Sequence, residues 1–170
     1  KELLSNVLDD ILANVPKEKI DERVSLFKRN MHNLSYEVMA NPIGVKGIGK
    51  YIQKDEETSF AKYKKGAPVH VKAAINYNSL IDHWYEGKKY EKISNGTKIK
   101  WVYLKENTFG FDAIAFKGHE DPREILELIK NHIDHNKMYE QAMSKKLGMF
   151  YKAMHWGGVE DKTTSMNRFF

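Results

Sequence analysis

The polar residues with the clearest chemical potential form a glycine- and lysine-rich stretch in the first third of the chain. It reads GVKGIGKYIQK over residues 44–54. Glycines let a backbone come close to a phosphate group and offer its N–H groups as donors. Lys46, Lys50 and Lys54 add positive charge, and Tyr51 supplies a flat ring or a hydroxyl group. These are the residue types of a phosphate contact.

The spacing of this stretch does not match the known nucleotide-binding loops. A Walker loop has Ser or Thr directly after its lysine, but Lys50 is followed by Tyr51. The dinucleotide fingerprint needs a strong preceding strand and a third glycine at the right offset, and both are missing. Two interpretations of these residues stay open: a contact to a nucleic-acid backbone, and a glycine-rich turn between two elements.

Other residues with catalytic or metal-binding potential are scattered. Among seven histidines, His132 and His135 are spaced i, i+3 on an expected helix, but no recognised pattern supplies the third ligand usual for zinc or iron. Histidines on polar faces are the better interpretation. There is no Gly-x-Ser-x-Gly motif, and the acids fall mainly on helix faces or in turns. No catalytic pair is predicted.

Positive charge is concentrated in the middle of the chain. Residues 44–105 hold 13 Lys and no Arg against 6 acids, a balance of +7, whereas the remaining residues have a balance of −2. This distribution is typical of a surface that binds a polyanion, although solubilising lysines give the same composition. The absence of cysteine excludes disulfides and thiolate sites and favours a reducing compartment.

The length and composition suit one folded domain. Hydrophobic residues make up 41% of the 170, which is enough for a core. No apolar run approaches the length of a membrane span, so no membrane association is expected. The chain opens on Lys1 instead of Met, and two interpretations stay open: an excised piece of a longer protein, and a separately encoded polypeptide that joins a partner.

Apolar periodicity predicts helices at both ends of the chain and a small sheet between them. Two helices over residues 3–12 and 16–34 are expected to pack as a hairpin. Residues 35–40 are expected to be extended. A third helix begins at Pro68, and Asn95-Gly96 between two β-prone runs predicts a hairpin of residues 91–94 with 97–104. A further strand is expected over residues 112–116.

The sequence Asp121-Pro122-Arg123-Glu124 has the form of a capped helix start. The aspartate can accept orphan N–H groups, proline suits the first helical position, and Glu124 can complete a capping box. The predicted fold class is α+β and mainly helical. We expect one domain with four parts: a helical hairpin over 1–34, a basic mixed part over 35–118, C-terminal helices over 119–156 and a tail over 157–170.

Three blocks, taken in order, resemble the thumb domain of family-B replicative DNA polymerases from tailed phages. They are GIGKY at 47–51, VHVKAAINYNSLI at 69–81, and KIKWVYLKENTFG followed by AIAF within 98–116. In that family the same blocks lie near the C-terminus, after the catalytic palm. The resemblance runs from about Leu34 to the end of the chain. It implies a thumb that grips duplex primer–template DNA without sequence preference.

Two departures from the family pattern concern arginines. The family tends to have His-x-Arg where this chain has His70-Val71-Lys72, and Pro-Leu-Arg-Glu where this chain has residues 103–106, Tyr-Leu-Lys-Glu. Charge is kept, but the bidentate guanidinium is lost. The residues expected to contact DNA are Lys46, Lys50, Tyr51, His70, Lys72, Asn78, Lys98 and Lys100.

The catalytic motifs of the resembled family do not occur in this sequence. The paired aspartates of the palm, the fingers lysine motif and the exonuclease acids are all missing. We therefore expect no catalysis and no cofactor in this chain alone, with magnesium held by the palm. The expected partner is the N-terminal polymerase part that carries palm, fingers and exonuclease, in the cytoplasm of a phage-infected bacterium.

The end of the chain, TTSMNRFF, resembles the peptide that docks such polymerases on the sliding clamp. Met166, Phe169 and Phe170 fit its pattern of an aliphatic residue, two spacers and two aromatics, while Thr163 replaces the usual glutamine. Alternatively, the two phenylalanines fold back onto the core.

Two other functions stay open. A stand-alone basic nucleic-acid-binding protein would not co-purify with a catalytic subunit. A small-molecule enzyme built on the histidines would hold a metal or have a deep acidic pocket.

Overall fold

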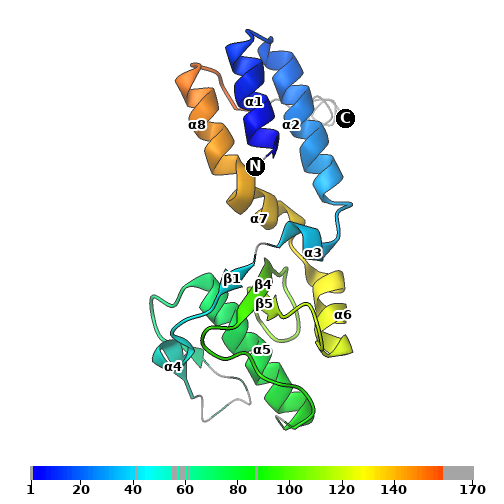
Figure 1. The fold of residues 1–170 in the computed structure, drawn as a ribbon, viewed down its shortest axis with the longest axis vertical. Coiled ribbons are helices and arrows are strands. Elements are labelled where there is room, and N and C mark those ends of the chain that lie inside the picture. The colour runs from blue at the N-terminus through cyan, green and yellow to red at the C-terminus, as the bar shows by residue number, and fades with distance from the viewer. Residues whose placement is uncertain are drawn as a thin grey trace. The chain divides into compact units, whose positions relative to one another are not determined.

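The computed structural model describes residues 2–158, except 41, 55, 56, 58, 59, 61 and 87. It is mainly helical with small antiparallel sheets, which confirms the predicted α+β class (Figure 1). The chain divides into two compact units. The helical unit comprises Lys1–Leu34 and His135–Phe170, and the sheet unit comprises Ser35–Asp134. The first boundary coincides with the expected end of the helical hairpin, whereas the second lies inside the expected C-terminal part.

The helical unit begins with the predicted hairpin of α1 (Glu2–Leu12) and α2 (Lys17–Met31). The connection turns at Asn14, whose φ of 56° lies in the left-handed region that asparagine tolerates. The N–H of Asn14 donates to Ile11 and that of Val15 to Asp10, which is the hydrogen-bond pattern of a Schellman motif. The connection between α1 and α2 therefore lies where the apolar periodicity predicted it.

The C-terminal helices complete the helical unit. A continuous helical segment consists of α7 (His135–Tyr139), a π-helical turn (Glu140–Ser144) and α8 (Lys145–Ala153). Figure 1 shows α1 between α2 and α8. The buried side chains that they contribute include Val7, Ile20, Val24, Leu147 and Tyr151.

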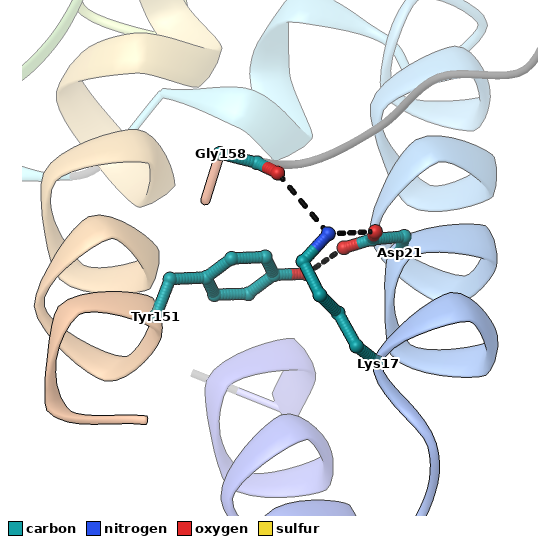
Figure 2. A network of polar contacts seen from close by, with 4 residues as sticks. All are labelled: Lys17, Asp21, Tyr151 and Gly158. Atoms are coloured by element: carbon teal, nitrogen blue, oxygen red, sulfur yellow. Dashed lines mark hydrogen bonds and ion pairs between the residues drawn. The ribbon is translucent and has the colours of Figure 1, made fainter. Parts of the chain in front are cut away.

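A buried polar network joins α2 to α8 (Figure 2). The Tyr151 hydroxyl donates to Asp21, and the Lys17 ammonium donates to the other oxygen of the same carboxylate at 2.6 Å. Lys17 also donates to the carbonyl of Gly158 at 3.3 Å. Since Asp21 is only 3% exposed, these donors compensate for the loss of its hydration.

The sheet unit is built around one long helix and a three-stranded antiparallel sheet. The strands are β1 (Ile43–Gly44), β4 (Lys98–Tyr103) and β5 (Ala113–Phe116), in the order β1-β4-β5. Helix α5 (Val69–Tyr85) packs on β5, and all four residues of β5 are buried. Both α5 and β5 were predicted from their apolar patterns.

Smaller elements surround this core. A two-stranded ribbon consists of β2 (Ile52–Gln53) and β3 (Lys62–Tyr63). Helix α4 (Ile48–Tyr51) precedes the ribbon, and α6 (Arg123–His132) ends the unit. Residues 35–40, expected to be extended, contain the short helix α3 (Tyr36–Met39), because the Ser35 carbonyl accepts the N–H groups of the first turn.

The predicted hairpin of residues 91–94 with 97–104 does not form. Asn95-Gly96 does make a turn, but the backbone N–H and C=O of Ile93 both pair with the side-chain amide of Asn78. Strand β4 pairs instead with β1 and β5. A side chain from α5 therefore takes the place of the expected partner strand.

Asp121 caps a different turn from the one predicted. Its carboxylate accepts the N–H groups of Lys117 and Gly118, which precede it, and the hydroxyl of Tyr77. Helix α6 begins without a side-chain cap, and Glu124 accepts from Tyr85 instead of closing a capping box.

Candidate nucleic-acid interface

The glycine-rich stretch, residues 44–54, begins with a turn that is hydrogen-bonded to the Asn95-Gly96 turn. The backbone of Val45 exchanges hydrogen bonds with Gly96 and Thr97, and the Asn95 side chain accepts the N–H of Ile48 at 3.1 Å. Gly47 has a φ of 87°, and a Cβ there would meet the Tyr51 ring at 3.4 Å. The left-handed backbone conformation therefore favours glycine at this position, whereas the contact with Tyr51 would be an ordinary van der Waals one.

The ribbon of β2 and β3 continues directly from this turn. Ile52 pairs with Tyr63, and the N–H of Lys64 donates to the carbonyl of Tyr51 at 2.8 Å. The ribbon is also connected to α5, because the ammonium of Lys72 lies 5.7 Å from the centre of the Tyr63 ring. The turn, the ribbon and the start of α5 are thus neighbouring parts of one surface region.

This region brings together three segments that contain no acidic residue. Residues 42–54, 62–81 and 94–100 hold nine lysines and neither Asp nor Glu. Gly44 and Lys98 are paired across β1 and β4, which places the third segment beside the first. The acids adjoining these segments are residues 55–57, between the two strands of the ribbon, and Asp82, directly after the second segment. We call this region the lysine surface.

Four of the predicted contact lysines keep their charge without a carboxylate partner. Lys46, Lys50 and Lys98 are exposed and Lys72 is half-buried. No carboxylate in the described part of the chain forms an ion pair with any of these four. Lys50 lies 5.1 Å from the centre of the Tyr51 ring. An aromatic face holds an ammonium in place while leaving its charge unneutralised, as a phosphate contact requires.

The beginning of α5 adds to the positive field. Its first turn carries His70 and Lys72 and no acid, and Pro68 provides no side-chain cap. The N-terminal end of a helix is itself the positive end of the helix dipole, so these two basic side chains are poorly placed for helix stability. A nearby anion would relieve this arrangement.

Two of the predicted DNA contacts have partners inside the chain. The carboxamide of Asn78 uses both of its ends on the backbone of Ile93, at 2.8 and 2.7 Å. The ammonium of Lys100 donates to the carbonyl of Glu37 at 2.8 Å. The structure therefore groups Lys46, Lys50, Tyr51, His70, Lys72 and Lys98 and assigns Asn78 and Lys100 to intrachain bonds.

Sequence reasoning missed Tyr63 and Asn76 beneath this surface. The Tyr63 hydroxyl donates to Asn76 at 2.7 Å, and the Asn76 amide donates to the carbonyl of Ala113 at 2.8 Å. Burial raises the pKa of Tyr63, and the charge of Asp112 acts in the same direction. A usable signal was present, since Asn76 is a polar residue within the largely apolar sequence of α5.

The histidines do not form the helical pair considered from their spacing. Helix α6 ends at His132 and α7 begins at His135, so one helix does not carry both. Within the described ranges, no three His, Asp or Glu side chains are grouped as metal ligands would be. Over those same ranges, no helix combines the length and apolar character needed to cross a membrane.

The proposed clamp peptide, with Met166, Phe169 and Phe170, lies outside the described residues. No protein-family model matches this chain, and no curated protein matches it.

Proposed function

We propose that the lysine surface binds the phosphate backbone of duplex DNA and that the chain is the thumb portion of a family-B replicative DNA polymerase. The observation that carries the proposal is the convergence of three acid-free segments with nine lysines on one region of the sheet unit. Phosphate contacts of this kind position a protein on DNA without reading its sequence. The primer–template duplex is the substrate class.

In this proposal the chain performs no chemistry by itself. A catalytic polymerase part supplies the palm, the fingers, the exonuclease and their magnesium ions. The C-terminal peptide with Met166, Phe169 and Phe170 attaches the assembly to the sliding clamp. The order of the three sequence blocks and the pattern of this peptide support the polymerase assignment.

The charge of the lysine surface predicts a steep dependence of DNA binding on salt. Each phosphate contact contributes a slope of about −0.9 in a plot of log affinity against log salt concentration. Replacing Lys46 and Lys50 together by Ala should weaken binding roughly tenfold at physiological salt and reduce the slope by about 2. The loss should be equal for duplexes of unrelated sequence.

A matched control separates local contact from overall charge. Lys19→Ala with Lys152→Ala removes the same charge from exposed positions of the helical unit. Fluorescence anisotropy with a labelled duplex, titrated at several salt concentrations, should show the large effect only for the first pair. Equal effects of the two pairs, or no duplex binding by the unmodified chain, would contradict the proposal.

A further inference from the structure

Asn76 is a fully buried polar residue in the apolar face of α5. It is 1% exposed, and its neighbours Ile75 and Tyr77 are equally buried. A carboxamide at such a position is costly unless both of its ends are hydrogen-bonded. Here the oxygen accepts from Tyr63 of the ribbon, and the nitrogen donates to Ala113 of β5.

The carbonyl of Ala113 explains why a side-chain donor is needed there. Strand β5 lies at the edge of its sheet, so one side of its backbone has no partner strand. Asp112 accepts from Leu104 on the β4 side, and successive residues of a strand point their backbone groups to opposite sides. The Ala113 carbonyl therefore points to the open edge, where Asn76 satisfies it.

Tyr63, the first residue in this series of hydrogen bonds, belongs to the ribbon. Tyr63 pairs with Ile52 across the ribbon, and its ring also lies under the ammonium of Lys72. The Tyr63 hydroxyl thus fixes β3 relative to α5. It also fixes the aromatic ring against which the Lys72 ammonium lies. The raised pKa of Tyr63 keeps this hydroxyl protonated and able to donate.

We propose that Tyr63 and Asn76 form a positioning relay that holds the ribbon and Lys72 in register with the DNA backbone. The relay rests on the proposed function of the lysine surface. Tyr63 acts here through its hydroxyl and not as a contact to DNA. Tyr63→Phe keeps the aromatic ring under Lys72 but removes the donor to Asn76.

The test compares Tyr63→Phe with Tyr77→Phe in the full chain. Tyr77 is one residue from Asn76 on the same helix and also loses a hydroxyl bonded to a side chain, but its partner is Asp121, outside the lysine surface. Anisotropy titration should show three- to tenfold weaker duplex binding and a salt slope reduced by about one contact for Tyr63→Phe. Tyr77→Phe should match the unmodified chain.

Hydrogen exchange provides a readout independent of DNA. The Lys64 amide, bonded to Tyr51 at the base of the ribbon, should lose protection in Tyr63→Phe, while the amides between β4 and β5 keep theirs. If the unmodified chain binds no duplex, the proposed function fails. If it binds duplex but Tyr63→Phe retains the same affinity, slope and Lys64 protection, the relay is wrong. Should Tyr63→Phe not fold, added duplex must still increase Lys64 protection in the unmodified chain, and unchanged protection would overturn the relay.

Discussion

Tyr151 of α8 donates a hydrogen bond of 2.5 Å to Asp21 of α2, and both residues are almost completely buried (Figure 2). The two residues come from opposite ends of the chain, so this bond closes the helical unit. Tyr151 also packs edge-on against Trp156, at 5.4 Å between ring centres.

Tyr151→Phe should destabilise the helical unit by about 1–3 kcal/mol, because one oxygen of a buried carboxylate loses its donor. Urea unfolding followed by circular dichroism measures this change. Tyr139→Phe is the control, since that residue is also buried but its hydroxyl has no hydrogen-bond partner in the described part of the chain. Equal losses in the two variants would show that the bond to Asp21 does not stabilise the unit.

Stability should fall as the pH rises above about 10, the ordinary pKa of tyrosine. Burial raises the pKa of Tyr151 and of Tyr77, and a carboxylate beside each hydroxyl raises it further. The folded state therefore holds protons that the unfolded state has lost, and each such tyrosine costs up to about 1.4 kcal/mol per pH unit. Urea unfolding between pH 9 and 11 should show a flatter decline for Tyr77→Phe with Tyr151→Phe. If stability declined equally in the double variant and the unmodified chain, these two tyrosines would not be the cause of the pH dependence.

Gly47→Ala should destabilise the sheet unit by about 1 kcal/mol or more. The substitution places a side chain at a φ of 87°, in the left-handed region that residues with a Cβ rarely adopt. Gly49→Ala, two residues further on inside α4, is the matched control; a Cβ there meets nothing within 4 Å, and the substitution should be neutral or slightly stabilising. Thermal unfolding gives the melting temperatures of both variants. An unchanged melting temperature for Gly47→Ala would show that glycine is not needed at this position.

Deleting residues 166–170 should abolish binding to the cognate sliding clamp and leave folding and duplex binding unchanged. Aromatic anchors of such peptides carry roughly 2 kcal/mol or more each, so Phe169 and Phe170 should dominate. Titration calorimetry with the clamp gives the affinity, and Lys46→Ala with Lys50→Ala should retain it. A lower melting temperature after deletion would instead favour phenylalanines that fold back onto the core.

Local patterns predicted those elements that local physics determines. The hairpin of the first two helices and the long apolar helix after Pro68 depend on neighbouring residues, and both form as expected. The hairpin of residues 91–94 with 97–104 and the Asp121 cap were wrong because residues distant in sequence take up the groups that each prediction required. Asn78 binds Ile93, and Tyr77 draws the carboxylate of Asp121 toward an upstream turn.

In the candidate site too, some features were predictable from local sequence and others depend on contacts between distant segments. The excess of lysines was evident from composition, Lys46 and Lys50 from the glycine-rich stretch, and Lys72 from the family resemblance. Their grouping depends on pairings between short strands, which periodicity does not detect in elements of two residues. The relay of Tyr63 and Asn76 was missed for a similar reason, since its function appears only when three elements meet.

The division of the helical unit between the two ends of the chain affects how the protein folds during synthesis. Helices α1 and α2 emerge before the sheet unit, but α8, which packs against α1, follows only after the entire sheet unit. Until then the apolar faces of α1 and α2, including Val7 and Ile20, have no cover from α8. The sheet unit can fold as soon as it has been made, whereas the first helices must wait. They are consequently the segment most exposed to aggregation on the ribosome.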